Sequence, residues 1–205
     1  MSLVSNLFLL FVAASVLVYY IVPHKFQWLV LLCFSYIYYL AGGVRYVGFL
    51  LFSTLVTWLI ALAVEKTEAK GSHKGARNLL VLGLLLNFGM LGVVKYTNFA
   101  IENLNALFHM NLRGMEILLP LGISFYTFQS SGYLLDVYWK RCEAEKNPVK
   151  YALFVSFFPQ ILQGPIGRYS RLAHQLYEPH KFEGKNITRG FERILWGFFK
   201  KMILA

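Results

Sequence analysis

Long apolar blocks, separated by short polar stretches, are the feature that most constrains the fold of this 205-residue chain. A helix needs about 20 mostly apolar residues to cross a bilayer. Only 15% of the residues are charged, whereas soluble domains carry about a quarter. We therefore predict an all-α, polytopic helical membrane protein with five to six membrane segments, forming a single domain over residues 1–205. The apolar blocks cover residues 3–22, 26–42, 47–64, 79–94, 118–139 and, more briefly, 151–163.

The basic residues indicate an orientation for these segments. The net charge is +10, from 20 Lys and Arg against 10 Asp and Glu. In a soluble protein this excess would suggest nucleic-acid binding, but here the basic residues lie between apolar blocks, where the positive-inside rule explains them. Loops 65–78 and 140–150 hold many of them and share a side if the segments alternate. We therefore expect these loops inside the cell, the N-terminus outside, and no nucleic-acid partner.

The last apolar block breaks off within FFPQILQGPIGRYSR, residues 157–171. Pro159 interrupts a helical hydrogen-bond ladder, and Gly164 with Pro165 is typical of a turn. If every segment crossed the membrane, the basic tail after residue 163 would lie outside, against the charge rule. A re-entrant segment at residues 157–168 keeps the tail inside, because broken backbone is tolerated where protein or a water-filled cavity surrounds it. A short, tilted helix that ends in an interfacial turn is the alternative.

Several polar side chains lie at membrane depth and are candidates to line a cavity. Asp136 is the only acid inside an apolar block, and such an acid suggests a functional site by default. Pairing with Lys140 at position i+4 is its structural alternative. For the serines of the same block and Thr127, we favour a role in helix packing. The candidate lining residues are Gln129, Asp136, Gln160, Gln163 and Arg168.

The sequence contains no recognisable catalytic or metal-binding arrangement. The two cysteines and five histidines do not form a metal-site pattern, and no histidine lies inside an apolar block, where a buried general base is expected. No phosphate-binding loop or Ser-His-Asp pattern is present. Residues 187–205 alternate basic with aromatic and aliphatic side chains, which is typical of a helix lying along the membrane interface. The residues alone leave an enzyme, a transporter and a scaffold subunit open.

Two motifs resemble the membrane-bound O-acyltransferase family. They are LPLGISFYTFQSSGYLLDVY at residues 119–138 and FFPQILQGPIGRYSR at residues 157–171, in this order. LGVVKYTNF at residues 91–99 and GFFKKMILA at residues 197–205 also fit. The FYTFQ and FPQ sequences within these motifs are most similar to the bacterial alginate O-acetyltransferase-like branch, rather than to the D-alanyl-transferring branch.

The resemblance implies transfer of an acyl group from a cytoplasmic donor to a hydroxyl of an exported polysaccharide. The donor would be a co-substrate, acetyl-CoA or an acyl carrier, and no bound cofactor is implied. The implied partners are the bilayer of the bacterial plasma membrane, the polysaccharide and further acetylation proteins. The family's catalytic histidine, often in a Trp-His context, has no counterpart here. The resemblance therefore implies the N-terminal half of a longer protein, inactive alone, with the histidine beyond residue 205. A transporter or scaffold subunit is the alternative, although no transporter-like internal repeat is found.

Overall fold

The computed structural model describes residues 6–108, 113–114, 120, 122–161, 164, 166–200 and 203. Every regular element within them is a helix, which confirms the all-α prediction. Two helices, α3 and α4, are long and apolar enough to cross a membrane, and α1 is a shorter apolar helix. A count of five to six membrane segments stays a prediction. The helices are α1 (Asn6–Ile21), the short η1 (His24–Phe26), α2 (Gln27–Gly42), α3 (Val44–Ala69), α4 (His73–Phe108), α5 (Ile123–Tyr138), α6 (Pro148–Ser156), α7 (Phe158–Ile161), α8 (Tyr169–Tyr177) and α9 (Gly184–Phe199).

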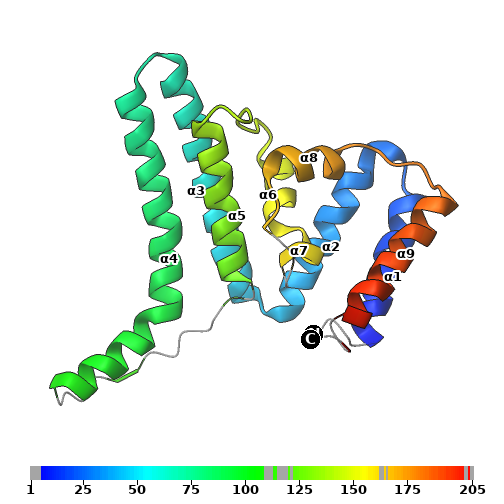
Figure 1. The fold of residues 1–205 in the computed structure, drawn as a ribbon, viewed down its shortest axis with the longest axis horizontal. Helices are drawn as coiled ribbons and strands as arrows, with labels where there is room; N and C mark the ends of the chain where they lie inside the picture. The colour runs from blue at the N-terminus through cyan, green and yellow to red at the C-terminus, as the bar shows by residue number, and fades with distance from the viewer. Residues whose placement is uncertain are drawn as a thin grey trace.

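The centre of the fold is the packing of α3, α4 and α5, which run side by side (Figure 1). Helix α2 then joins α3 to α6, and α1 packs on the outer side of α2. A buried polar cluster ties α3 to α4. Ser53 Oγ donates to Asn87 Oδ1 over 2.8 Å, and Asn87 Nδ2 donates to Thr57 Oγ1 over 3.0 Å. These bonds satisfy an amide in apolar surroundings, where an unpaired amide would cost several kcal/mol, roughly 2–7.

The observed helix bounds extend the sequence predictions in two places. Helix α4 begins at His73 and continues to Phe108, and its last part bends away from the bundle (Figure 1). Helix α8 has no counterpart among the predicted segments. Its pattern was nevertheless readable, because Tyr169, Ala173 and Leu176 recur at helical spacing and are the residues that α8 buries.

Helix α6 starts at a well-formed N-terminus. The Asn147 side chain accepts hydrogen bonds from the backbone N–H groups of Val149, at 2.9 Å, and Lys150, at 3.4 Å. Pro148 occupies the first turn, where its missing N–H has no helical partner to lose. The chain therefore enters α6 in a fixed direction directly after the 140–147 loop.

The segment that follows α6 returns to the end of the bundle from which it came. The Tyr169 hydroxyl in α8 donates to Glu145 Oε2 over 2.7 Å, and the Tyr177 hydroxyl donates to the Lys150 carbonyl over 2.7 Å. Helix α8 thus lies beside the loop that precedes α6 (Figure 1). The turn between α3 and α4 and the α1–α2 connection lie at the same end, which we call the basic end. It carries loops 65–78 and 140–150.

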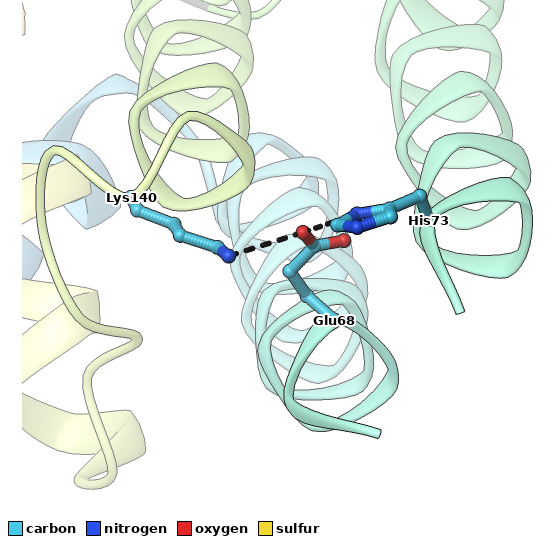
Figure 2. A network of polar contacts seen from close by, with 3 residues as sticks. All are labelled: Glu68, His73 and Lys140. Atoms are coloured by element: carbon cyan, nitrogen blue, oxygen red, sulfur yellow. Dashed lines mark ion pairs between the residues drawn. The ribbon is translucent and has the colours of Figure 1, made fainter. Parts of the chain in front are cut away.

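A charged cluster at the basic end joins the α3–α4 turn to the end of α5 (Figure 2). The Glu68 carboxylate oxygen Oε1 lies 2.6 Å from His73 Nδ1 and 3.2 Å from Lys140 Nζ. The Glu68 side chain is only 10% exposed, while those of His73 and Lys140 lie largely in solvent. Because the Lys140 ammonium and a His73 ring nitrogen both contact one shielded carboxylate, the cluster holds three elements in register.

Lys140 occupies a backbone position that normally belongs to glycine. Its φ is 58°, in the left-handed region. The Lys140 N–H bonds to the Val137 carbonyl at 3.0 Å, and the Arg141 N–H bonds to the Asp136 carbonyl at 2.8 Å. This pair of bonds is a Schellman motif, in which the residue after the helix cap is usually Gly. The backbone of Lys140 is therefore strained. Its side chain contacts Glu68 from this strained position.

We predict that Lys140→Gly is more stable than Lys140→Ala by about 1 kcal/mol, because a non-glycine residue in the left-handed region costs roughly that amount. Both variants lose the bond to Glu68, so the comparison isolates the backbone. Chemical denaturation in detergent micelles measures the difference. Lys146 lies in the same loop without a positive φ, so Lys146→Gly should be no more stable than Lys146→Ala. An equal or reversed order at position 140 would contradict the assignment of strain.

Candidate functional site

The interruption between α6 and α7 is the centre of the candidate site. Helix α6 ends at Ser156, and Phe157 adopts φ −51° and ψ 107°, outside the helical region. Pro159 has no N–H to offer to an α-helical partner, and in a continuous helix its ring would clash with the Val155 carbonyl four residues earlier. The sequence prediction of a broken segment at this point is therefore confirmed as a break in the helix. The re-entrant course of this segment in a membrane stays a prediction.

Side chains from two neighbouring helices satisfy the backbone groups that the break exposes. Gln129 Nε2 of α5 donates to the Phe154 carbonyl over 2.9 Å. From the other side, the Phe158 N–H donates to Ser35 Oγ of α2 over 3.2 Å. Gln129 is only 3% exposed and Ser35 is fully buried. Gln129, which the sequence predicts to line a cavity, is observed as a hydrogen-bond donor to the backbone of the broken helix.

The glycines after the break let the chain fold back around Gln160. A Cβ at Gly164 would lie 2.7 Å from the Gln160 Cα, and one at Gly167 would collide with the Gln160 amide nitrogen. The Gly164 N–H also bonds to the Gln160 carbonyl at 2.9 Å. Gln160 is half-buried at the centre of this turn. Gln163 and Pro165, which the sequence placed in the same turn, lie outside the described residues.

The two sequence motifs meet in space at Gly122. Gly122 has a φ of 70° and directly precedes α5. A Cβ there would lie only 2.6 Å from the Ile161 carbonyl oxygen in α7. Residues 119–138 and 157–171 therefore pack against one another at a contact that only glycine permits.

Buried hydroxyl groups face the interior near this break. Among the residues that the structure describes, four of these buried hydroxyls have no hydrogen-bond partner. Buried polar atoms without partners are rare in native proteins and suggest that water or a ligand fills the gap. The interior next to α5 and α6 thus contains hydroxyl groups that could bond to water or to a ligand. These hydroxyls belong to Tyr126, Thr127, Ser131 and Ser156.

Asp136 lies at the basic end of α5 with its own partner. Its Oδ1 is 3.6 Å from Arg141 Nη1, and the Arg141 guanidinium lies 4.6 Å from the centre of the Trp139 ring. The expected partner Lys140 instead contacts Glu68. Spacing by four residues pairs side chains only while the helix continues, and α5 ends at Tyr138.

A second feature of the site is a pocket of about 420 Å³ between residues 142–146 and α8. Glu145 organises it. Its backbone N–H donates to the Tyr133 hydroxyl over 2.8 Å, and its carbonyl accepts from Trp58 Nε1 at 2.7 Å. Its carboxylate accepts from Tyr169, as noted above, and burial raises the pKa of the Tyr169 hydroxyl well above its ordinary value. Sequence reasoning did not single out Glu145, because nothing in the sequence marks a loop acid as the meeting point of three helices.

An aromatic wall separates this pocket from the broken helix. The Tyr169 ring centre lies 4.7 Å from that of Tyr133 and 4.9 Å from that of Phe154. Phe154 is the residue whose carbonyl accepts from Gln129. Arg168 directly precedes α8, is exposed, and lies at the basic end beside the pocket. The candidate residues therefore divide into Gln129 and Gln160 at the break, and Asp136 and Arg168 at the basic end.

Within the described part of the chain, no group of three or more His, Cys, Asp or Glu side chains is arranged to hold a metal ion. His174 of α8 contacts Glu178, with 3.1 Å between Nδ1 and Oε2, and both side chains are exposed. His109 lies outside the described residues. The candidate site therefore has hydrogen-bond donors, buried hydroxyl groups and, at the basic end, the exposed guanidinium of Arg168.

Several curated proteins are similar to this chain. The "Probable alginate O-acetylase AlgI" of Azotobacter vinelandii is 34% identical over 98% of the chain. The "Peptidoglycan O-acetyltransferase" of Helicobacter pylori is 32% identical over 87%, and the "Teichoic acid D-alanyltransferase" of Lacticaseibacillus rhamnosus is 26% identical over 80%. No family model matches the chain, and no solved structure gives a significant match.

The chain spans about two-fifths of these relatives, namely 41%, 38% and 37% of their respective lengths. The all-helical fold, with two helices long and apolar enough to cross a membrane, and these relatives together indicate a class of helical membrane proteins whose curated members are named for acyl-group transfer. Within this class the chain belongs to the membrane-bound O-acyltransferase family, and it corresponds to a partial region of the alginate O-acetylases. The higher identity to these than to the D-alanyltransferase agrees with the reading of its motifs.

We predict that Gly122→Ala destabilises the protein by about 1–3 kcal/mol, because a side chain there strains the backbone and meets the Ile161 carbonyl. Thermal unfolding in detergent measures the loss. Gly92→Ala on α4 is the matched control. A Cβ at Gly92 meets nothing within 4 Å, so alanine should be neutral or stabilising there. Equal stability of the two variants would contradict the proposed contact between the motifs.

We also predict slow alkylation of Cys142, which lines the pocket at the basic end. Burial, together with the charges of Asp136 and Glu65, raises the pKa of its thiol to about 11. The thiolate is the reactive form, so the fraction present at pH 8 is about a hundredfold below that of a thiol with the ordinary pKa of 9.0. Maleimide labelling in a Cys33→Ser background should accelerate as the pH rises toward 11. Asp136→Asn removes a negative charge, lowers this pKa and speeds labelling at pH 8. Fast labelling at pH 7 would contradict the assignment.

Proposed function

We propose that the protein to which this region belongs is a membrane O-acyltransferase that acetylates an exported polysaccharide. The observation that carries this proposal is the similarity to O-acetylases over 98% of the chain. The contact between the two motifs at Gly122 and Ile161 supports it, since it joins the matching segments into one structural unit. Because the chain matches about 40% of its relatives, the activity is assigned to the complete protein.

In the reaction, the oxygen of a sugar hydroxyl attacks the carbonyl carbon of an acyl thioester. The new carbon–oxygen bond forms as the carbon–sulfur bond breaks, and the hydroxyl proton passes through a general base to the departing thiol. The proposed base is a histidine outside this chain. This region would lie on the N-terminal side of that histidine. The donor is acetyl-CoA or an acyl carrier on the cytoplasmic side.

This region would provide the polar passage by which donor and acceptor meet. The basic end faces the cytoplasm in this proposal, with the N-terminus outside and several membrane segments in the bacterial plasma membrane. The broken helix α6–α7 would be re-entrant, entering from the basic end and returning to it. The hydrogen bonds of Tyr169 and Tyr177 to the start of this segment support that path. Broken backbone at membrane depth is expected only beside protein or a cavity.

Each candidate residue has a role in this arrangement. Gln129 and Gln160 hold the shape of the interruption, and Gln163 stays a candidate from the sequence. Arg168, exposed at the mouth, would contact the phosphate groups of the donor with its planar guanidinium. Asp136 would keep the end of α5 in place through Arg141.

A direct test uses the complete protein in proteoliposomes with a radiolabelled acetyl donor, the polysaccharide and its partner acetylation proteins. Label that appears in the polysaccharide, and not without the protein, supports the acyltransferase. Transport of a substrate without acyl transfer would favour the alternative, a transporter, since transporters also use broken helices at their binding sites.

We predict that Arg168→Lys lowers kcat/KM for the donor by about tenfold, which corresponds to roughly 1.4 kcal/mol. Lysine keeps the charge but loses the two-pronged hydrogen bonding of arginine. Arg171→Lys is the matched control, because Arg171 is also exposed and lies on α8. Normal turnover of Arg168→Lys with donor below saturation would leave Arg168 as an anchor to lipid headgroups.

A further inference from the structure

A groove of about 990 Å³ runs between α1, α8 and α9. It lies on the opposite side of the bundle from α4, where α9 runs alongside α1 (Figure 1). Val12 and Val16 of α1 form one wall, and Ile187, Phe191 and Ile194 of α9 form the other. The α9 residues recur at the i, i+4 and i+7 spacing of one helix face, and the two valines of α1 are four residues apart. This volume lies at the upper end of the range, about 300–1,000 Å³, that is common for ligand sites.

Small residues keep the middle of the groove open. Ala13 of α1 and Gly190 of α9 both line it. A Cβ added at Gly190 would find no atom within 4 Å. Helix α9 buries none of its 16 residues despite its apolar face. The groove is therefore unfilled by the chain's own described side chains.

One end of the groove is polar and rigidly fixed. His180, Lys181 and Asn186 lie there together with Tyr19. The buried side chain of Gln27 holds the His180 backbone from both sides, donating to its carbonyl over 3.0 Å and accepting from its N–H at 2.9 Å. The Tyr19 hydroxyl lies 3.1 Å from His180 Nδ1. Hydrogen bonds to α1 and α2 therefore fix the position of this end of the groove.

The charge at this end is positive on balance. Lys181, Lys185 and Arg189 outnumber the single acid Glu183 between residues 181 and 189. Glu183 already accepts a hydrogen bond from Asn186 Nδ2 over 2.9 Å. Lys25 lies two residues before Gln27, in the α1–α2 connection. A negatively charged group is therefore the complementary partner.

We infer that the groove binds one anionic phospholipid, with its phosphate at Lys181 and an acyl chain between α1 and α9. An acyl chain suits the walls because it has no backbone polar groups to satisfy, whereas an extended peptide would need a hydrogen-bond partner at each residue. The polar end lies at the basic end of the bundle, where the headgroup of a lipid in that leaflet would be found. The inference requires that the protein is embedded in a bilayer, and it does not depend on acyl transfer.

The test is photocrosslinking of the complete protein to which this chain belongs, purified into nanodiscs that contain the lipid probe. Phosphatidylglycerol with a photoreactive acyl chain is the probe, and the zwitterionic phosphatidylcholine analogue is the comparison. Phosphatidylglycerol should crosslink to α1 or α9 about fivefold more than phosphatidylcholine, as expected for a Lys contact near a membrane surface. Peptide mapping by mass spectrometry locates the crosslinks.

Two pairs of variants separate the groove from the surrounding lipid. Gly190→Leu fills the groove and should reduce crosslinking by about fivefold, while Gly197→Leu on the same helix should leave it within about twofold, because Gly197 does not line the groove and also has open space around it. Lys181→Gln should abolish the preference for the anionic lipid, and Lys185→Gln should retain it, since Lys185 does not line the groove.

Equal crosslinking in Gly190→Leu and Gly197→Leu would overturn the inference, and so would equal binding of the two lipids by the unchanged protein. Crosslinks from α1 or α9 to a second copy, or to a part of the same protein outside this chain, would also overturn it, because that segment would then occupy the groove. Size-exclusion profiles and helical content that match the unchanged protein establish that each variant is folded. Lys181→Gln alters only a surface charge, so its outcome stands even if Gly190→Leu misfolds.

Discussion

The need to satisfy backbone polar groups in apolar surroundings governs the structure around Phe157. Pro159 prevents α6 from continuing, and the break exposes the Phe154 carbonyl and the Phe158 N–H. Gln129 and Ser35 supply the two missing partners. They come from α5 and α2, so both helices must flank α6 at a fixed height. An unpaired group here would cost several kcal/mol, roughly 2–7, and this penalty specifies the packing of three helices at once.

The basic end is held together differently, by charges and hydroxyls that meet in one loop. Residues 141–147 contact α3 through Trp58 and Glu65, and contact α8 through Tyr169. The tyrosines carry much of this arrangement, because each has an apolar ring for the interior and a hydroxyl for the loop. In the proposed function, a donor that approaches from this end would meet this surface, which the aromatic wall of Tyr133, Phe154 and Tyr169 borders.

The sequence was sufficient for the helices and for the break, but not for the partners of the polar residues. Apolar block length and Pro159 are local signals, so α1 to α5 and the interruption could be predicted. The bond from Gln129 to Phe154 joins residues 25 apart and depends on how α5 and α6 pack. Asp136 pairs with Arg141 rather than Lys140 because α5 ends between them, and Lys140 turns away in a left-handed conformation. Helix α8 was missed because its nine residues are too short and polar to form an apolar block.

The two sides of the bundle differ in a way that suits their proposed tasks. Helices α3, α4 and α5 share the main core, and their polar cluster at Asn87 fixes their register. Helices α1 and α9 lie at the other edge, and the chain between α8 and α9 is attached chiefly through Gln27 and by the contact of Phe182 with Tyr20, whose ring centres are 5.3 Å apart. Reaction geometry requires a rigid scaffold, because misplacement of reacting groups by about 1 Å can cost a hundredfold in rate. An edge whose apolar faces remain open is compatible with exchange of lipid, since lipid can fill it without disturbing the interrupted helix behind it.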